Sequence, residues 1–464
     1  MRMGTRALAC AVLAGFAGLC FGSEAYPEAG GGEQFGVAQS LDLPELSVHA
    51  AGVVEQILEL ARHNELEAPA VTRLIFTKED MEARGYVKRL MRDVGLEVRE
   101  DAMGNIYGRW VGSDPSLAAV GSGSHTDAIP GAGMYDGVLG VLGPIEAVRA
   151  LKETGFVPRR SIDVIMFTSE EPTRFGFGCI GSRAMAGALP VERLDRAVDI
   201  LDAEEGSFGK AACGAGYGGC EGHADMLERV NLGAGFYDAF VELHIEQGPL
   251  LEQKGLDIGI VTAIAAPAAL RVEFRGGGGH AGALLMPYRN DAGLAGAELA
   301  LAVEAAVLAT GSNDTVGTTG LFKISPGAIN SVPREAVLEI DVRDIDGPRR
   351  DGVVSQILAS ADEIAARRGV EVSVNLINQD PPASCGDAII NAVEGAANSL
   401  GLDSMRMVSR AYHDSLFMAR VGPIGMIFIP CRDGVSHRPD EFSSMEAIGR
   451  GVHTLALSLA RLSA

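Results

Sequence analysis

The amino-acid sequence predicts an α/β protein that carries a smaller α+β domain inserted into its chain. Short apolar runs typical of buried strands occur among helical patterns, and several of them end in polar clusters. Residues 266–378 follow the order strand, helix, strand, strand, helix, strand, which is that of a ferredoxin-like fold. The 464-residue chain is also too long for one compact core. We therefore expect a main domain over 46–265 and 379–464, with the insert between its two parts.

The N-terminal residues predict a secretory signal. Arg2 and Arg6 precede an apolar run over 7–21, and residues 23–25 are small enough for cleavage, so we expect a signal peptide over 1–25. Residues 26–45 predict a disordered leader. The apolar run is shorter than the roughly 20 residues that span a bilayer, and no later segment is a convincing span. We expect a soluble protein of the secretory pathway, in the endoplasmic reticulum lumen; no terminal retention signal is present to distinguish retention from export.

Charge and cysteine content narrow the classes of partner. The formal net charge of −22 argues against nucleic acid and anionic membrane surfaces. Five cysteines remain outside the signal, too few for a disulfide framework. Cys213 and Cys220 lie in a glycine-rich loop and could pair in an oxidising lumen, although unpaired buried thiols are the more common outcome.

The individual elements follow from periodicity and caps. The main domain begins with a helical pattern near Leu46. A capping box at Thr77–Asp80 starts a second helix that Gly95 ends. A helix after Asp136 contains Pro144, for which we expect a kink or a late start. Strands are expected at 96–99, 106–111, 118–121, 162–168 and 426–429, with another that starts at Tyr237 and ends in the polar cluster of 244–249. Helices are expected at 388–400 and the C-terminus. In the insert we expect strands at 270–274, 315–324, 337–343 and 371–377, with a strongly amphipathic, Ala-rich helix at 291–308 and another helix at 354–367.

The small-residue stretch 121–137 carries the first candidate site. His125 and Asp127 form a His-x-Asp pair, and Asp136 follows eleven residues after His125. At a helix N-terminus Asp136 would accept backbone N–H groups, stay ionised and be able to bind a cation. His125 could bind a metal through one ring nitrogen while Asp127 fixes the other. A loop histidine and an ordinary capping aspartate explain the same stretch equally well, so later residues must decide.

Two further strands end in polar clusters. Glu170 and Glu171 follow the strand 162–168, at the edge where α/β folds place their chemistry. Their side chains should point apart and can take different roles. His244 and Gln247 end the strand that starts at Tyr237, although a single histidine there is more often a core residue than a ligand.

Five of the nine histidines share positions in loops or at strand ends, beside Gly, Pro or acidic residues; they are His125, His244, His280, His413 and His437. Imidazoles and carboxylates without cysteine favour Zn, Mn or Co in a catalytic site. Two metal ions about 3.5–4 Å apart, bridged by a carboxylate and a water, would activate that water and polarise a carbonyl. Glu170 is the candidate proton carrier.

Several motifs in one order resemble the aminoacylase-like dinuclear metallohydrolases, in the branch of allantoate, ureidoglycolate and N-carbamoyl-amino-acid amidohydrolases. The similarity runs from about residue 50 to the C-terminus. The motifs are Ser124-His-Thr-Asp127, Met134-Tyr-Asp-Gly137, Glu170-Glu-Pro172, His244-Ile-Glu-Gln-Gly-Pro249, Gly279-His-Ala-Gly282 and Ser436-His437. Within this branch, residues 283–293 and 409–420 are most similar to plant-type ureidoglycolate amidohydrolases.

The resemblance implies a metal-dependent exopeptidase-like catalytic domain, with a mixed sheet between helices, and an insert that acts as lid and dimerisation domain of a homodimer. It implies two divalent cations per subunit, manganese first, with zinc or cobalt possible. His125 and His244 would hold one ion, Glu171 and His437 the other, and Asp136 would bridge them.

The remaining roles also come from the resemblance. Glu170 would be the general base and Asp127 would orient His125, while His280 would reach the site from the partner subunit and stabilise the oxyanion. The implied substrate-binding residues are Gln247, His280, Asn330, Arg343, Tyr412 and His413. For Arg343 the residue chemistry agrees, because a 2-hydroxy carboxylate needs a bidentate cation in an otherwise acidic protein.

The implied reaction is hydrolysis of the ureido group of (S)-ureidoglycolate to glyoxylate, ammonia and carbon dioxide, in purine catabolism. Allantoate and N-carbamoyl-amino acids are the alternative substrates. An inactive lumenal binding protein on the same scaffold is the alternative outside the enzymes.

Overall fold

A nine-stranded mixed sheet positions most of the polar clusters. The computed structural model describes residues 46–464 except 67, 205 and 221, so the predicted signal peptide and leader lie outside the described residues. The strand order is β15 (Ala383–Ser384), β8 (Ile258–Ile264), β17 (Ile424–Ile429), β7 (Tyr237–Ile245), β4 (Ala119–His125), β6 (Ile162–Phe167), β3 (Ile106–Trp110) and β2 (Glu97–Glu100). The ninth strand, β16 (Ser404–Ser409), pairs with β8 outside this order. The four central strands β17, β7, β4 and β6 are parallel. Their carboxyl ends therefore meet at one edge of the sheet.

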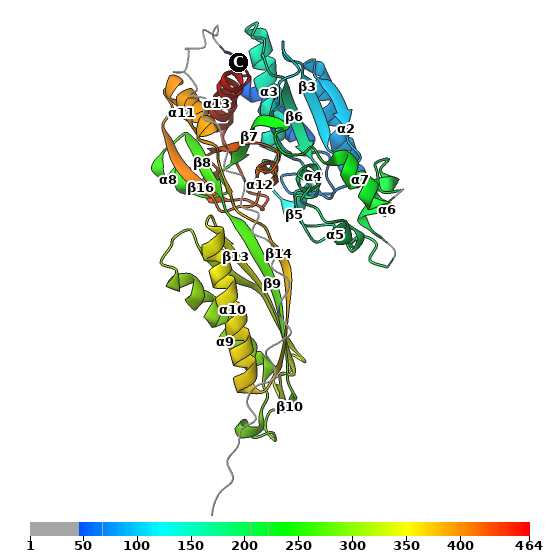
Figure 1. Cartoon of the computed structure of the whole chain (residues 1–464), viewed down its shortest axis with the longest axis vertical. Coiled ribbons are helices and arrows are strands. Elements are labelled where there is room, and N and C mark those ends of the chain that lie inside the picture. Colours follow the sequence, from blue (N-terminus) through cyan, green and yellow to red (C-terminus); the bar gives the residue numbers. More distant parts are fainter. Residues whose placement is uncertain (1–45, 67, 205, 221) are drawn as a thin grey trace, which may run out of the picture. The chain divides into compact units, whose positions relative to one another are not determined.

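Helices cover this sheet (Figure 1). The helices α3 (Val138–Glu153) and α13 (Met445–Ser463) pack on β4 and β7, with α1 (Ala50–Leu60) and α11 (Asp387–Ser399) beside α13. The predicted capping box is confirmed, because the Thr77 side chain accepts a hydrogen bond from Asp80 N at the start of α2 (Lys78–Asp93). Pro144 lies inside α3, which begins at Val138, so the predicted late start is wrong.

Short elements connect the main strands. The sequence pattern did not predict the small helices between β6 and β7. The short helices are α4 (Ile180–Met185), α5 (Val191–Asp195), α6 (Phe208–Gly214), α7 (His223–Val230), α8 (Leu250–Lys254) and α12 (Ser415–Met418), with 3-10 turns η1 (Met286–Tyr288) and η2 (Arg432–Gly434). Two strand pairs lie outside the large sheets, β1 (Val71–Arg73) with β5 (Ala128–Ala132) and β10 (Gly279–His280) with β12 (Ser331–Val332).

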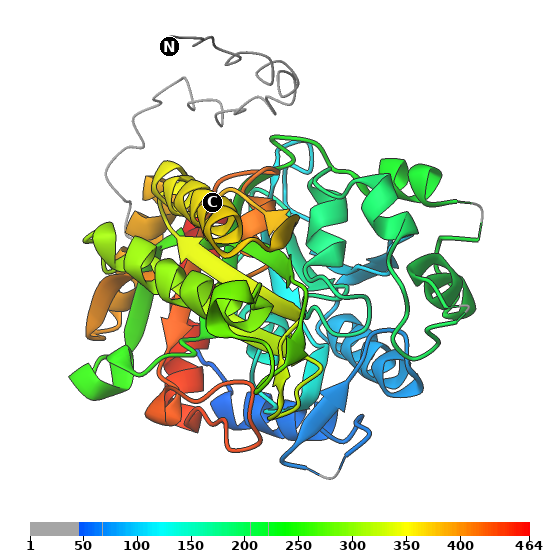
Figure 2. The same cartoon turned by 90° about the horizontal axis from the view of Figure 1, so that it is seen from below.

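A second, antiparallel sheet has the order β11 (Val316–Ser325), β13 (Glu335–Asp344), β9 (Ala266–Arg275), β14 (Glu371–Gln379). Buried and half-buried residues alternate along β13, so one face of the sheet is apolar. The helices α9 (Ala292–Ala309) and α10 (Gly347–Arg368) pack on that face and on each other (Figures 1 and 2). The sheet starts at Ala266 and ends at Gln379, where the predicted insert runs from 266 to 378.

Helix α9 differs from its prediction. Its exposed side carries Leu294, Leu301 and Leu308, which are 44%, 66% and 72% exposed, so the helix is apolar on both sides rather than strongly amphipathic. Within the described part of the chain it is also the one helix that is long and apolar enough to cross a membrane by length and composition alone. Its buried side, with Leu299 and Val303, belongs to the core of the second sheet.

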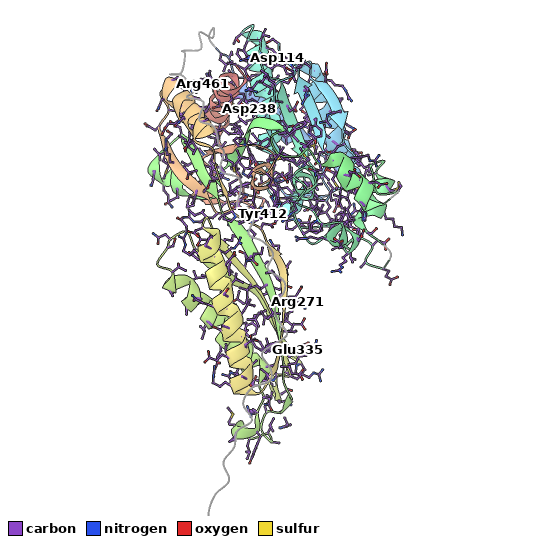
Figure 3. The ribbon with its side chains drawn as sticks, viewed as in Figure 1. Asp114, Asp238, Arg271, Glu335, Tyr412 and Arg461 are labelled. Carbon is purple, nitrogen blue, oxygen red and sulfur yellow. A yellow bond between two sulfur atoms is a disulfide. The ribbon has the colours of Figure 1, made fainter. Side chains whose placement is uncertain are left out.

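The chain passes from the large sheet to the second sheet and back again, and buried arginines form hydrogen bonds at these two connections. Arg350 on α10 donates to the carbonyl of Ala266, where the first connection ends, and to that of Asp380, where the second begins. Arg183 on α4 makes a bidentate ion pair with the Asp380 carboxylate, at 2.8 and 2.7 Å. Figure 3 shows Tyr412 near these connections.

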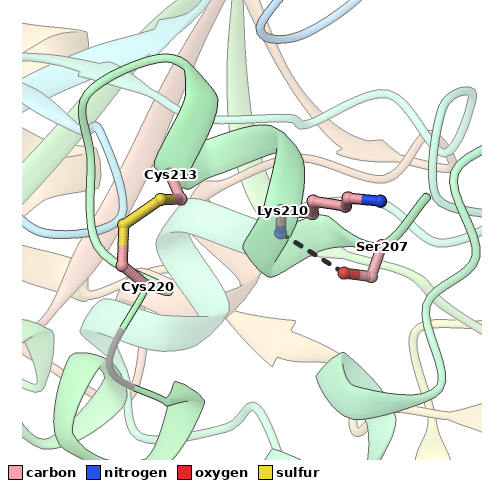
Figure 4. The surroundings of a disulfide bond; sticks show 4 residues. All are labelled: Ser207, Lys210, Cys213 and Cys220. Carbon is pink, nitrogen blue, oxygen red and sulfur yellow. Dashed lines mark hydrogen bonds between the residues drawn. A yellow bond between two sulfur atoms is a disulfide. The ribbon is translucent and has the colours of Figure 1, made fainter. Parts of the chain in front are cut away.

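The structure also settles the cysteine pattern. Cys213 and Cys220 form a disulfide that closes the end of α6, a helix that Ser207 caps at its other end (Figure 4). The commoner outcome at these two positions, unpaired thiols, is therefore wrong. Cys179, Cys385 and Cys431 are free and buried.

Candidate metal centre and active site

The predicted metal ligands lie at the carboxyl ends of the central strands. His125 is the last residue of β4 and His244 is the penultimate residue of β7. Glu171 follows β6, Asp136 precedes α3, and His437 lies in the segment after β17. The parallel arrangement of these strands therefore brings residues from distant parts of the chain to one place.

These five side chains form two groups that share Asp136. Asp136 Oδ1 lies 3.1 Å from His244 Nε2 and 3.9 Å from His125 Nε2. Asp136 Oδ2 lies 3.1 Å from His437 Nε2, which is 3.3 Å from Glu171 Oε1. In each group the possible ligand atoms lie within 4.8 Å of one another. A carboxylate that turns one oxygen to each group is suited to bridge two cations, and the donors are the nitrogen and oxygen ligands that Zn, Mn or Co accept.

Asp136 lies directly before the N-cap of α3, near the helix start as predicted, but its carboxylate does not accept the backbone N–H groups expected there. The N-cap of α3 is Gly137, at φ +67°, and no side chain caps the helix. The Asp136 carboxylate instead accepts hydrogen bonds from Gln247 Nε2 at 2.8 Å and Ser436 Oγ at 2.9 Å. Its backbone is held by Glu441, whose carboxylate accepts Asp136 N at 3.0 Å. The loop therefore presents this carboxylate to the imidazoles rather than to the helix.

The two buried imidazoles are oriented by backbone carbonyls. His125 Nδ1 lies 3.0 Å from the Asp127 carbonyl oxygen, and His244 Nδ1 lies 2.9 Å from that of Ile245. Both rings thus turn Nε2 toward Asp136. The predicted role of Asp127 changes in detail: its carboxylate is 3.7 Å from His125 Nδ1 and accepts Glu170 N at 3.2 Å and Glu171 N at 3.0 Å. Asp127 therefore positions both glutamates and the imidazole.

Glu170 lies beside the groups without belonging to either. Its Oε2 is 3.7 Å from His125 Nε2, and its Oε1 is 3.4 Å from the Cys179 thiol. Burial, followed by the charges of Glu171 and other carboxylates, raises the pKa of Glu170 well above its usual value. A buried carboxyl group with a raised pKa is suited to take up and release a proton.

The same crowding of acids favours the protonated form of His244 and His437, whereas burial lowers the pKa of His125. Hydrogen bonds to Asp136 and Glu171 raise the pKa of His437 to about 10. Burial opposes the charged form of His244, but Asp136 outweighs it and raises its pKa to about 9. Burial likewise disfavours ionised Asp136, yet hydrogen bonds from His244 and His437 hold its pKa well below the usual range. Negative charge is therefore concentrated at the shared carboxylate, where a cation would bind.

Strained backbone is concentrated around this centre. Six residues other than glycine have a positive φ in the described part of the chain, and four of them lie at the site: Ser169, Cys179, Gln247 and His437. Such conformations cost about 1–3 kcal/mol each and persist where the surrounding structure imposes them. Their position marks this edge of the sheet as functional.

A pocket of about 430 Å3 opens onto both groups. Three predicted substrate residues, Gln247, Arg343 and Tyr412, line it. The Arg343 guanidinium is held by the Asp341 carboxylate, with Nε 2.8 Å from Oδ1. The Tyr412 hydroxyl donates to Asp380 at 2.5 Å.

Comparisons with known proteins show the family of this chain. The pattern of peptidase family M20/M25/M40 matches residues 119–461. The chain belongs to this family. The family prediction and the fold class are therefore confirmed, and the protein is a hydrolytic enzyme of a metal-binding family.

Individual M20/M25/M40-type relatives cover most of the chain. It is 56% identical to a ureidoglycolate hydrolase of Oryza sativa subsp. japonica over 90% of this chain and 85% of the relative. It is 39% identical to an N-carbamoyl-L-amino acid amidohydrolase of Geobacillus stearothermophilus, over 86% and 95% of the two chains. A crystal structure of AtUAH in complex with glyoxylate has a TM-score of 0.81 and 56% identity, over 90% of this chain and 98% of that one.

His413 does not line the pocket of this M20/M25/M40 protein, contrary to the prediction. Its ring packs behind that of His244, with centroids 4.7 Å apart, and its Nε2 lies 2.8 Å from Ser409 Oγ. Burial lowers the pKa of His413 well below the usual value, so it is a neutral support for His244. Its position directly after Tyr412 gives no local signal of this orientation.

His280 and Asn330 are not among the residues that line the pocket. Both are exposed, at the paired strands β10 and β12. His280 Nδ1 accepts hydrogen bonds from Gly282 N and Ala283 N, each at 3.1 Å. Within one chain the structure does not bring these two side chains to the site, and the expected contribution from a partner subunit stays a prediction.

Proposed function

We propose that this protein hydrolyses (S)-ureidoglycolate to glyoxylate, ammonia and carbon dioxide, using two divalent cations, with manganese as the native metal. The observation that carries the hydrolytic mechanism is the Asp136 carboxylate, which turns one oxygen to each ligand group. The substrate follows from the relatives, because the 56% identity to ureidoglycolate hydrolases of rice and Arabidopsis thaliana exceeds the 39% and 30% to carbamoyl-amino-acid and allantoate amidohydrolases.

His125 and His244 would hold one cation, Glu171 and His437 the other, and Asp136 both. Ions bound there supply an activated water and a polarised ureido carbonyl. Glu170 takes the proton from the attacking water and returns it to the leaving nitrogen, a role that its burial and raised pKa support. Asp127 keeps the glutamate pair in place through the two backbone N–H groups that it accepts.

Arg343, Gln247 and Tyr412 would contact the substrate from the pocket wall. Removing the Arg343 guanidinium should raise KM more than it lowers kcat, because a charge-assisted contact to the substrate carboxylate is lost. An Arg343→Ala variant that changes only the melting temperature would refute this role.

A homodimer is part of the proposal. Leu294, Leu301 and Leu308 are seven residues apart and form an exposed apolar stripe on α9. Phe322 and Ile324, 44% and 46% exposed, lie on β11, which is an edge strand of the second sheet. An apolar stripe beside an unpaired sheet edge is suited to association with a second copy. His280 and Asn330 would then act in the partner's site.

Residence in the secretory pathway, in the endoplasmic reticulum lumen, also stays part of the proposal. The Cys213–Cys220 disulfide supports an oxidising compartment, since disulfides are rare in the cytosol.

Purified protein loaded with manganese should be assayed against ureidoglycolate, allantoate and an N-carbamoyl-L-amino acid, with release of ammonia as the readout. We expect ureidoglycolate to have the highest kcat/KM. Equal or better turnover of allantoate would overturn the proposed substrate. Metal analysis of protein prepared without chelator tests the choice of manganese, and light scattering tests the dimer.

A further inference from the structure

Arg193 is a positively charged residue of the pocket wall to which no role has been assigned so far. It lies on α5, and its guanidinium stacks over the ring of Phe177, with Cζ 4.5 Å from the ring centroid. Both residues line the same pocket as His125 and Glu170, and the segment Gly176-Phe177-Gly178 forms part of the wall between α5 and the catalytic glutamates. Arg193 is half-buried.

The Arg193 guanidinium makes no direct pair with an acidic side chain of the described residues, although the charge of Asp380 acts on it from a distance. Among the residues that the structure describes, none makes a hydrogen bond or an ion pair with its side chain. The other two arginines of this pocket already make ion pairs. Arg183 makes a bidentate pair with Asp380, and Arg343 makes one with Asp341. Among the described residues of the pocket, Arg193 is therefore the arginine whose side chain makes no ion pair.

The surroundings of Arg193 favour an anion. Burial and then the charge of Arg183 lower its pKa, and the charges of Asp380 and Tyr412 offset this only in part, so a directly bound anion would favour the charged guanidinium. Stacking on Phe177 restricts the planar guanidinium and leaves its N–H groups available for two parallel bonds to a carboxylate.

We propose that Arg193 is a specificity-determining residue that binds the carboxylate of the substrate. The inference deepens the proposed function and rests on it, because ureidoglycolate carries a carboxylate at the end of the molecule opposite its ureido group. Arg343 shares this role with part of its donors, because its guanidinium already pairs with Asp341, whereas the guanidinium of Arg193 pairs with no described residue.

The test compares Arg193→Gln with Arg193→Lys and with Arg196→Gln in the full, manganese-loaded protein. Arg196 is the exposed C-cap residue of the same helix and does not line the pocket, so its substitution removes the same charge outside the site. We expect the KM for ureidoglycolate to rise about 10- to 100-fold in Arg193→Gln, the range of a lost charge-assisted hydrogen bond, with kcat changed less than threefold. Arg193→Lys should recover part of the loss, and Arg196→Gln should match the wild type.

Binding of glyoxylate, measured by calorimetry, gives a readout that does not need turnover. Its Kd should rise by a similar factor in Arg193→Gln only. Equal KM and Kd values in Arg193→Gln and Arg196→Gln would overturn the inference. A wild type that does not turn over ureidoglycolate would instead refute the proposed function, and the glyoxylate Kd values would then decide the role of Arg193 alone.

Discussion

Replacing Glu170 with Gln separates catalysis from metal binding at this centre. Glu170 lies 3.7 Å from His125 but belongs to neither ligand group, so the substitution should leave the metal content unchanged. The amide keeps the shape of the side chain and cannot take up the proton of the attacking water. We expect kcat to fall by about 10²–10⁴-fold, the usual contribution of a general base.

The same substitution should stabilise the metal-free protein. Burial and the charges of Glu171, Asp414, Asp127 and Asp136 raise the pKa of Glu170 well above the usual 4.5. Between 4.5 and the raised value the folded state binds more protons than the unfolded state, so the stability due to this group falls as pH rises through that window. Each pKa unit corresponds to about 1.4 kcal/mol, which a neutral amide would recover.

Turnover, metal analysis and thermal denaturation in chelator at pH 4 and pH 8 provide the test. The melting temperature of Glu170→Gln should exceed that of the wild type at pH 8, and the difference should shrink at pH 4. Glu246→Gln is the matched control for turnover and metal content, because Glu246 is also a buried carboxylate near the site, but its oxygens accept the N–H groups of Leu250 and Leu251. Burial raises the pKa of Glu246 too, so the melting temperature of this control shows what removal of a buried charge does outside the metal centre. Activity of Glu170→Gln within tenfold of the wild type would exclude Glu170 as the base, and a lower melting temperature at pH 8 would contradict the electrostatic reasoning.

Three other predictions concern the metal centre and the disulfide. Gly137→Ala should abolish metal binding, measured by elemental analysis, because the new Cβ would lie 2.4 Å from His125 Nε2 and the φ of residue 137 is +67°. Retained metal would show that the loop can shift. Metal affinity should rise with pH up to about 10, because neighbouring carboxylates raise the pKa of His437 to about 10 and a bound cation must displace that proton. Calorimetry in buffers of different ionisation enthalpy should detect the released proton. Metal binding that does not depend on pH would refute this prediction. Reducing Cys213–Cys220, with a sequence separation of 7, should destabilise this loop by about 2.4 kcal/mol and speed its amide exchange, whereas unchanged exchange would show that other contacts hold it.

The ligand set came from the family resemblance, but the sequence pattern itself indicated that several of these residues follow buried strands. His125 and Glu171 follow parallel strands, whose carboxyl ends meet at one edge whatever the loops do. The second sheet could be predicted for a similar reason, since the alternation along β13 fixes which residues are buried. Both patterns can be recognised in the local sequence without knowledge of the tertiary contacts.

The partners of polar side chains could not be predicted in the same way. Asp136 was expected at or near the start of α3 with its carboxylate on backbone N–H groups, but Gly137 is the N-cap and the carboxylate accepts Gln247, 111 positions away. Arg183 and Asp380 are 197 positions apart, and nothing in either neighbourhood selects the other. Arg193 stands out only after its neighbours are known, because its distinguishing property is the lack of a direct ion pair with the described residues.

The junction between the two sheets connects these observations. Asp380 uses its carbonyl to accept Arg350 from α10, and its carboxylate to bind both Arg183 and the Tyr412 hydroxyl at the pocket. Burial opposes the ionised form of Asp380, but the hydrogen bonds from Arg183 outweigh it and lower its pKa, so the charge is kept at the junction. A displacement of the second sheet that moves Asp380 must therefore also move Tyr412 or break a buried ion pair, whose loss costs about 3–5 kcal/mol when one partner stays buried. The position of the second sheet and the shape of the substrate pocket are thus energetically coupled through one carboxylate.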